Sequence, residues 1–257
     1  MRYATGVIHL PKAWGPLCIV ALLACAANAL AISGNNVPDN QLPDQSCKIS
    51  YFLADGTRNG LCSGTLISKN QILTAIHCED MGQAAAETEI SCGRAAEVRH
   101  VVSRVRNPAF DDRGIYFGVF DEAILTVDQD LTVEPIQLPR STDEIGALVS
   151  RGSCGVFGYG LSENWTDAGI LRGGVGRASS YIDDNRSRTV DGRPFNEERI
   201  HITGVATRPG DSGGGLYCKR MSHGSPVGNW ILSGLIVHDG DPDSIDASLA
   251  WISAQAN

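Results

Sequence analysis

The sequence predicts an all-β fold, and three observations support this prediction. Strand-like runs recur along the chain, and every run is short. Turn residues separate the runs, and glycine is plentiful, with 29 among 257 residues. Long helical patterns do not alternate with the runs. Short strands divided by turn residues are typical of an all-β sandwich or barrel rather than of a parallel α/β sheet.

Eight segments carry the strand pattern. In chain order they are Lys48–Leu53, Leu61–Ile67, Gln71–Thr74, Val98–Val105, Glu122–Val127, Ser153–Tyr159, Leu216–Lys219 and Trp230–Val237. Residues Ala247–Ala256 are the best helix candidate, because they are apolar on one side. A proline closes one strand-rich half of the chain at Gln137-Leu138-Pro139-Arg140, so we expect a seam there.

The first 31 residues predict an export signal, and hence a secreted or periplasmic protein. Arg2 and Lys12 supply positive charge, an uncharged apolar core runs from Leu17 to Ala27, and small residues follow. This core is about 11 residues long, whereas a membrane-spanning helix needs ~20, so we expect no stable membrane span. One alternative stays open. Leu22-Leu23-Ala24-Cys25 resembles a lipobox, which would make the protein a lipoprotein anchored at Cys25.

The charge of the chain argues against polyanionic partners. Its formal net charge is −8, and removal of residues 1–31 takes away two positive charges and no acids, which gives −10. An acidic surface is a poor partner for nucleic acid or anionic membranes. We therefore expect no nucleic acid as a partner.

Six cysteines lie outside the predicted signal. They are Cys47, Cys62, Cys78, Cys92, Cys154 and Cys218. An even number in an exported chain predicts three disulfides, for which there are 15 possible connectivities. The spacings contain no C-x-x-C pair, so a zinc site is disfavoured and we expect no metal.

Three residues suit nucleophilic catalysis. His77 can accept and return a proton near neutrality. Ser212 lies in a glycine-rich loop, and a serine hydroxyl becomes a good nucleophile only when a base takes its proton. Asp121 precedes an apolar strand and is a candidate for the third group, which holds the base in the right tautomer. Each residue alone has an ordinary structural explanation, and only the combination predicts catalysis.

The local sequences around these residues strengthen that prediction. They read Leu73-Thr74-Ala75-Ile76-His77-Cys78, Phe120-Asp121-Glu122-Ala123-Ile124-Leu125 and Pro209-Gly210-Asp211-Ser212-Gly213-Gly214. Their order and their gaps of 44 and 91 residues resemble those of the trypsin/chymotrypsin family. Ile136-Gln137-Leu138-Pro139 resembles the linker between the family's two barrels, and Trp251-Ile252 the start of its terminal helix. The resemblance covers nearly all of the predicted mature chain.

The resemblance implies a fold of two packed six-stranded antiparallel Greek-key barrels with a short C-terminal helix. Within a peptidase domain at 32–257, barrel 1 is expected at about 45–135, barrel 2 at about 141–245 and the helix at about 247–256. The active site is expected between the barrels, in a monomer.

The resemblance also implies two of the disulfides. Cys62-Ser63-Gly64-Thr65-Leu66-Ile67 matches the strand whose cysteine pairs with the one after the catalytic histidine, which implies Cys62–Cys78. Cys154-Gly155-Val156-Phe157-Gly158-Tyr159-Gly160 resembles the family's C-x-x-x-G-W-G strand, which implies Cys154–Cys218. Cys47 and Cys92 are then left over, and the resemblance does not itself supply that pair.

The mechanism implied by the resemblance is that of a serine endopeptidase, whose partner is a protein or peptide substrate. Ser212 attacks the scissile carbonyl, His77 acts as general base and then general acid, and Asp121 orients His77. The N–H groups of Gly210 and Ser212 form the oxyanion hole, and water resolves an acyl-enzyme. No cofactor is needed.

The family's activation mechanism implies roles for two further residues. An N-terminal ammonium inserts beside the aspartate that precedes the nucleophile, which is Asp211 in this sequence. Cleavage after Ala29-Leu30-Ala31 would expose Ile32 as the new terminus. Export itself would then activate the enzyme, unless Ile32 merely happens to lie near the cut.

The specificity pocket departs from the family pattern. Ala206, with Thr207 after it, stands at the pocket base, where relatives that cut after Lys or Arg carry a carboxylate. Val237-His238-Asp239 replaces the usual Ser-Trp-Gly of the substrate strand. We therefore expect small or apolar residues before the scissile bond. Two other functions stay open, a non-catalytic binding or adhesion module on the same fold and an esterase that uses the same triad.

Overall fold

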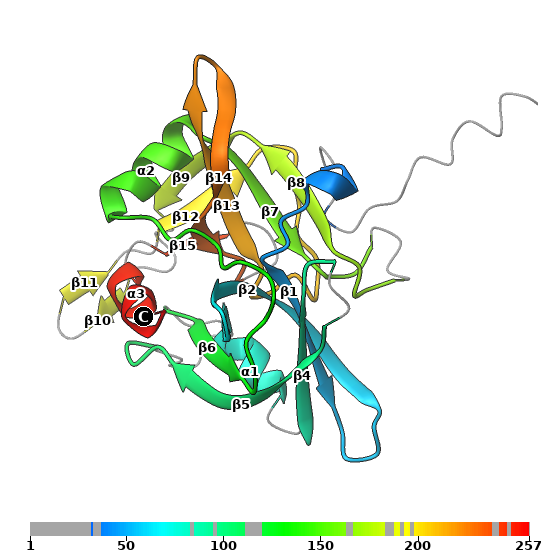
Figure 1. The fold of residues 1–257 in the computed structure, drawn as a ribbon. Helices are drawn as coiled ribbons and strands as arrows, with labels where there is room; N and C mark the ends of the chain where they lie inside the picture. Colours follow the sequence, from blue (N-terminus) through cyan, green and yellow to red (C-terminus); the bar gives the residue numbers. More distant parts are fainter. Residues whose placement is uncertain are drawn as a thin grey trace, which may run out of the picture.

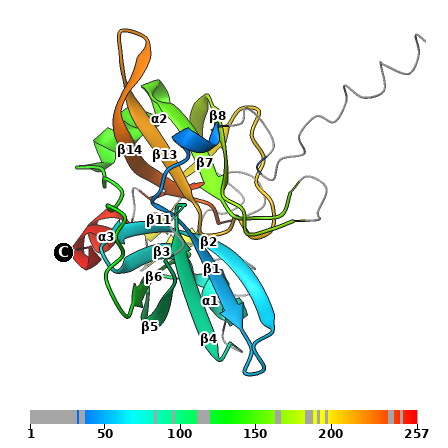
Figure 2. The ribbon, with the colours of Figure 1, turned by 45° about the vertical axis from the view of Figure 1, so that its right-hand side comes forward.

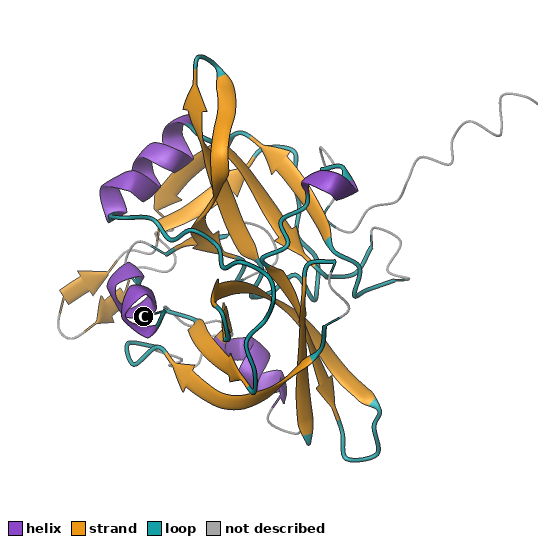
Figure 3. Ribbon diagram, viewed as in Figure 1, coloured by secondary structure: helices purple, strands orange, loops and turns teal. Residues whose placement is uncertain are grey.

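The computed structural model describes residues 32, 37–82, 85–94, 97–110, 120–162, 167–182, 188–190, 193–195, 198–237, 242–245 and 248–256. The predicted export signal, the lipobox, His238 and Asp239 lie outside these residues. Among the described residues, no helix has the length and apolar character that a membrane crossing requires. The chain is mostly β, with a few short helices (Figure 3).

The first half of the chain forms a closed barrel of six antiparallel strands, which we call barrel 1. Its strands are β1 (Ser46–Phe52), β2 (Arg58–Ser68), β3 (Gln71–Ala75), β4 (Glu87–Cys92), β5 (Arg99–Arg106) and β6 (Glu122–Val127), in the order β1-β2-β3-β6-β5-β4. A short 3₁₀ helix, η1 (Asp39–Gln41), precedes it. Apolar side chains such as Ile49, Leu73 and Ile90 are fully buried in the core.

The second half forms a seven-stranded sheet, which we call barrel 2. Its strands are β7 (Ser153–Gly158), β8 (Arg172–Gly176), β9 (Ala178–Ile182), β12 (Glu198–Ile202), β13 (Gly215–Ser222), β14 (Ser225–Leu235) and β15 (Asp243–Ser244), in the order β8-β7-β13-β14-β15-β12-β9. Only Arg177 separates the two end strands, β8 and β9, in the chain. Counted as one bent strand, they close the sheet into six strands, as the resemblance implied. Strands β10 (Arg188–Val190) and β11 (Arg193–Phe195) form a separate ribbon.

Three α-helices complete the fold: α1 (Ile76–Gly82), α2 (Thr142–Arg151) and α3 (Leu249–Gln255). Helix α3 lies within the predicted C-terminal helix. The predicted elements included neither α1 nor α2. Helix α2 begins at Ser141, whose hydroxyl accepts a hydrogen bond from the backbone N–H of Glu144, and it buries Ile145, Leu148 and Val149. A capped segment with apolar residues three and four apart is an amphipathic helix start.

The two barrels pack against each other along β1 and β2 of barrel 1 and β7 and β13 of barrel 2 (Figures 1 and 2). The hydroxyl of the fully buried Tyr217 lies 2.9 Å from Oγ1 of Thr65 and 3.3 Å from Oγ of Ser46. These contacts join barrel 2 to two strands of barrel 1. The loops that follow β3, β12 and β14 are thereby held close to the junction of the barrels.

Three disulfides cross-link the strands. They join Cys47 to Cys92, Cys62 to Cys78 and Cys154 to Cys218. The first links β1 to β4, the second links β2 to α1, and the third links β7 to β13. All six of these cysteines are fully buried. The pairs are the two that the resemblance implied and the pair that it left over.

Candidate active site

His77 is the second residue of α1, and this helix directly follows strand β3. The backbone N–H of its neighbour Ile76 donates to the carbonyl of Asp121, at 3.2 Å. The disulfide from Cys78 to Cys62 ties the same turn to β2. The backbone of His77 is therefore fixed on both sides, by β6 and by β2.

Asp121 contacts His77 through both carboxylate oxygens. Oδ2 lies 2.6 Å from Nδ1 of the imidazole, and Oδ1 accepts the backbone N–H of His77 at 2.9 Å. The Asp121 side chain is fully buried, and that of His77 is 16% exposed. A buried carboxylate at Nδ1 favours the tautomer that carries its proton there, which leaves Nε2 as the basic atom.

A tight turn presents Asp121 to the histidine. The N–H of Glu122 donates to the carbonyl of Phe120 at 2.8 Å, so the turn closes over Asp121 alone. Phe120 has a φ of 60°, a left-handed conformation that is unfavourable for a bulky side chain. Backbone strain of this kind persists where the surrounding structure holds it, and it is common at functional sites.

Ser212 lies in the loop between β12 and β13, against the strands of barrel 1. Its carbonyl accepts the N–H of Ser63 at 2.8 Å, and Sγ of Cys78 lies 3.5 Å from the same oxygen. The next residue, Gly213, has a φ of 78°. A Cβ on Gly213 would lie 2.1 Å from Oγ1 of Thr74, so only glycine lets the loop approach β3 this closely. The structure thus brings Ser212 to the strand that leads into His77.

Gly210 lies in a turn with a left-handed backbone. Its φ is 95°, and its carbonyl accepts the Ser63 hydroxyl at 2.8 Å. Within the described part of the chain, the N–H groups of Gly210 and Ser212 donate to no protein acceptor. Two backbone donors two residues apart are then available to a ligand oxygen, as an oxyanion hole requires.

The carboxylate of Asp211 is completely buried behind this loop. Oδ1 accepts the N–H of Gly160 and Oδ2 that of Arg208, both at 2.8 Å. Burial raises the pKa of Asp211 to about 6, although these two N–H donors oppose the shift. Ile32, the expected activating residue, is also fully buried.

The residues expected to form the specificity pocket lie next to the same loop where the structure describes them. Ala206 is exposed and Thr207 is buried. Val237 is buried and follows Ile236, whose carbonyl accepts the N–H of Gly213 at 2.6 Å. Ala206 and Thr207 thus belong to the loop that carries Ser212, and Val237 follows a residue that is hydrogen-bonded to this loop.

Two buried polar clusters around the site were absent from the sequence prediction. Glu79 of α1 pairs with Arg104 of β5 and accepts from the Tyr51 hydroxyl at 3.4 Å. Burial raises the pKa of Glu79, while Arg104 opposes the shift. On the other side of Asp121, Glu122 accepts from Asn107 at 2.9 Å and from Ser248 at 2.8 Å. These contacts anchor α1 and α3 to barrel 1, and their partners lie too far apart in the chain for any local motif to reveal them.

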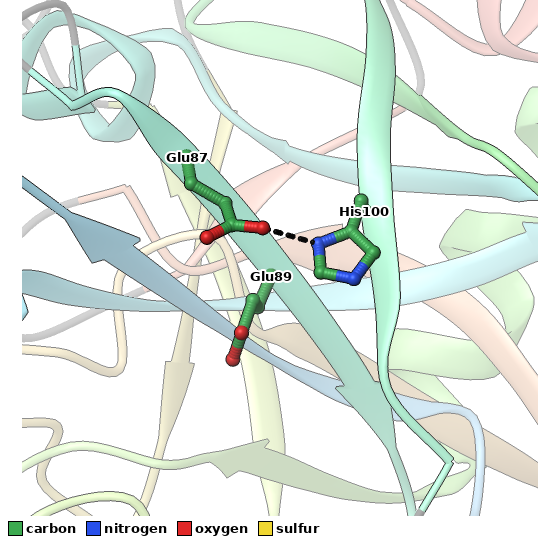
Figure 4. Close-up of side chains that lie close together, drawn as sticks. All are labelled: Glu87, Glu89 and His100. Atoms are coloured by element: carbon green, nitrogen blue, oxygen red, sulfur yellow. Dashed lines mark ion pairs between the residues drawn. The ribbon is translucent and has the colours of Figure 1, made fainter. Parts of the chain in front are cut away.

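One cluster of metal-ligand type lies outside the active site. Glu87 and Glu89 of β4 and His100 of β5 place a ligand atom each within 4.8 Å of one another (Figure 4). Nδ1 of His100 lies 2.8 Å from the Glu87 carboxylate, and both side chains are about half exposed. This geometry is that of a surface ion pair, and no catalytic step is assigned to it.

Comparisons with known proteins agree with this geometry. A family model described as Trypsin matches residues 33–235. The chain is 27% identical to chymotrypsin-like elastase family member 1 of Canis lupus familiaris over 75% of this chain and 77% of the relative. It is 25% identical to a chymotrypsin of Phaedon cochleariae over 75% and 71%. A solved structure titled HL collagenase shares the fold, with a TM-score of 0.57 and 19% identity over 87% of this chain and 97% of that one.

Proposed function

Since the chain belongs to the trypsin family, and is thus a serine endopeptidase, we propose that it cleaves peptide bonds with His77, Asp121 and Ser212 as its catalytic triad. The observation that carries this assignment is the two-point contact of the buried Asp121 with His77. The packing of the Ser212 loop against β2 and β3 supports it further.

The chemistry follows from these positions. Nε2 of His77 takes the proton of the Ser212 hydroxyl as its oxygen attacks the scissile carbonyl carbon. The buried Asp121 carboxylate stabilises the imidazolium that forms. The developing oxyanion accepts from the N–H groups of Gly210 and Ser212, each worth about 2.7–4 kcal/mol in comparable sites. His77 then protonates the leaving amine, and water, activated in the same way, hydrolyses the acyl-enzyme.

Digestion of a diverse peptide library by the purified exported protein tests the assignment. The wild-type protein should cut, and the Ser212→Ala protein should not. If both proteins left the library intact while folded and correctly processed, the family's catalytic function would be absent from this chain. Equal cutting by both would show that the activity belongs to another residue or to a contaminant.

We also propose that the protein is exported and that removal of residues 1–31 creates the active terminus at Ile32. The buried carboxylate of Asp211 is the expected partner of the new ammonium group. A buried carboxylate without a cation is costly, and an ammonium beside it stabilises its charged form. N-terminal sequencing of the exported protein should begin at Ile32. A terminus elsewhere, or a lipidated Cys25, would contradict the proposal.

Stability against pH should reveal the same pairing. When residues 1–31 are retained, Asp211 has a pKa of about 6, above its ordinary value of 3.8. The folded state then binds more protons than the unfolded state between these values, so the free energy of unfolding should fall as pH rises from about 4 to 6. A shift of about two units corresponds to ~3 kcal/mol.

Urea unfolding at pH 4 and pH 6.5 measures this loss. The form that begins at Ile32 should lose far less stability, because the ammonium lowers the pKa of Asp211. Asp211→Asn in the longer form should remove the pH dependence that Asp211 causes. Identical pH profiles for the two forms would show that Ile32 and Asp211 do not pair.

We further propose a preference for small or apolar residues before the scissile bond, because Ala206 brings no carboxylate to the pocket base. A peptide series that differs only at this residue should be cleaved fastest with Ala or Leu. The Lys and Glu peptides should be at least about tenfold slower, because burial of an unpaired charge in a pocket costs more than 1.4 kcal/mol. Fast cleavage after Lys would mean that another acid serves the pocket. The measurement is kcat/KM for the four peptides.

A further inference from the structure

A groove runs over the outer face of barrel 1, beside the nucleophile loop. It consists of two adjoining hollows, of about 530 Å³ and about 310 Å³. Lys48, Ser91 and Val98 line both hollows, so the two are continuous. Residues 169–171 form part of the wall of the larger hollow, and Arg58 lines the smaller one. We call this feature the Lys48–Arg58 groove.

One end of the groove adjoins the loop that carries Gly210, because the groove residue Tyr159 precedes Gly160, whose Cα lies 3.0 Å from where a Cβ on Gly210 would be. Lys48 is directly opposite Ser63 in the β1–β2 pair, and opposite residues project to the same face of the sheet. The Ser63 hydroxyl donates to the carbonyl of Gly210 at 2.8 Å and accepts the N–H of Tyr159, a groove residue, at 2.9 Å. Leu61 continues this face, since its Cδ2 lies 3.6 Å from where a Cβ on Gly210 would be.

The other end of the groove is reached along β2. Arg58 precedes Leu61 by three residues, which corresponds to about 10 Å of extended chain. An extended peptide covers that distance with about two or three residues. The strand that leads to Val237 contacts the nucleophile loop through Gly213 instead. The groove and the strand that leads to Val237 thus meet the nucleophile loop at different residues, and we take the groove to lie on the leaving-group side of Ser212, away from the expected specificity pocket.

Two cations converge in the groove without an acidic partner. Both side chains lie next to Gly169. A Cβ added to this glycine would be 3.6 Å from Cδ of Lys48 and 3.8 Å from Nη1 of Arg58. Throughout the described chain, neither side chain makes a hydrogen bond or an ion pair. Both therefore remain available to a ligand, although the protein carries a net charge of −8.

Other charges also line the groove, so it is the convergence of Lys48 and Arg58, rather than an excess of positive charge, that distinguishes it. Arg94 is held by Asp44 at 3.2 Å. Glu89 lines the smaller hollow on β4, and Asp39 lines the larger one. The exposed side chains of Val98 and Ile170, at 44% and 56% exposure, add apolar surface. An extended peptide with an acidic side chain between apolar neighbours complements these features.

We propose that the Lys48–Arg58 groove binds the leaving-group part of the substrate, and that Lys48 and Arg58 select an acidic side chain about two or three residues after the scissile bond. This inference rests on the proposed function, because it takes Ser212 as the point of cleavage. It assigns a substrate class to the enzyme, namely proteins with acidic residues shortly after the cleaved bond.

A matched set of peptides tests this inference. The peptides share one acyl-side sequence and carry Glu, Gln or Lys at the second or third residue after the scissile bond. Wild-type enzyme should show kcat/KM for the better Glu peptide roughly five- to tenfold above that for its Gln counterpart, as expected for two partly exposed charge contacts. The ratio should shrink in 1 M salt, because exposed charges are screened.

Variants then assign the preference to the two cations. In the double variant Lys48→Gln/Arg58→Gln, the ratio of kcat/KM for the Glu peptide to that for the Gln peptide should fall to about one. Lys48→Glu/Arg58→Glu should prefer the Lys peptide. Lys69→Gln is the matched control, since Lys69 pairs with Glu134 outside the groove, and it should keep the preference. Equal wild-type rates for Glu and Gln, or a preference that survives in the double variant, would overturn the inference.

Binding separates this inference from the triad assignment. A fluorescent Glu peptide should bind the Ser212→Ala protein more tightly than the matching Gln peptide binds it. The triple variant that also carries Lys48→Gln and Arg58→Gln should bind the two peptides equally. Discrimination in binding without any cleavage by the wild type would support the groove and refute the proposed triad. Cleavage by the wild type with no discrimination in either assay would refute the groove alone.

Discussion

The Ser212→Ala protein should hydrolyse a good peptide substrate on the order of 10⁶-fold more slowly than the wild type in kcat, with KM nearly unchanged. In the proposed mechanism the hydroxyl of Ser212 forms the acyl bond. The substitution leaves the backbone N–H donors of Gly210 and residue 212 in place. It also leaves the main-chain contact of residue 212 with Ser63. Some rate acceleration over water should therefore remain, about 10³-fold.

A double variant makes this prediction sharper. Loss of either the nucleophile or its base disables the same step, so His77→Ala added to Ser212→Ala should cost almost nothing further. Pre-steady-state release of the first product should show a burst with the wild type if deacylation is slow, and none with either variant. Two outcomes would contradict a shared triad. In one, the Ser212→Ala protein keeps more than about a hundredth of the wild-type kcat, and in the other, the fold losses in kcat of the two single variants multiply in the double variant.

The fold was predictable wherever apolar residues recur with a clear strand period. All eight predicted strands are present, because runs such as Glu122–Val127 bury nearly every residue. Strands β4, β8 to β12 and β15 were not predicted. In β4, Glu87–Cys92, burial alternates, but one of the three buried residues is Thr88, so only two apolar residues carry the strand period. Helix α2 was missed as well, although Ser141 and Glu144 carry a helix-start signal three residues apart.

Closure of the second barrel depends on geometry that no local pattern encodes. The bend at Arg177 turns one extended segment from its pairing with β7 to its pairing with β12. The N–H of Thr203 donates to the Arg177 carbonyl at 3.0 Å, so the bend is held by a residue 26 positions later. Only the resemblance supplied the second barrel, because hydrogen bonds between distant strands leave no periodic signal in the sequence.

Short motifs identified the candidate catalytic residues, because each one lies within a few residues of distinctive neighbours. Residues that act through distant partners were not identifiable. Lys48 and Arg58 illustrate this, since each is a single charged residue in a strand and their convergence near Gly169 exists only in the folded chain. The same holds for Arg104, which reaches Glu79 across the barrel.

Asp121→Asn should lower kcat on the order of 10⁴-fold while leaving the fold intact. Asparagine has nearly the shape of aspartate, and its carbonyl oxygen can still accept the backbone N–H that Oδ1 of Asp121 accepts at 2.9 Å. Its NH₂ group then faces Nδ1 of His77, where Oδ2 now lies 2.6 Å away. A donor at that point favours the tautomer with the proton on Nε2, and this tautomer cannot take the proton of Ser212.

Glu122 supplies a matched control for this substitution. It is the neighbouring buried carboxylate, but it binds Asn107 and Ser248 rather than His77. Glu122→Gln should therefore cost about 1–3 kcal/mol of stability through its weakened buried hydrogen bonds and change kcat only a few-fold. Thermal unfolding and kcat, measured on both variants, separate the two roles. If Glu122→Gln lowered kcat as much as Asp121→Asn did, the loss would reflect disturbed packing of β6, and the orienting role of Asp121 would have to be abandoned.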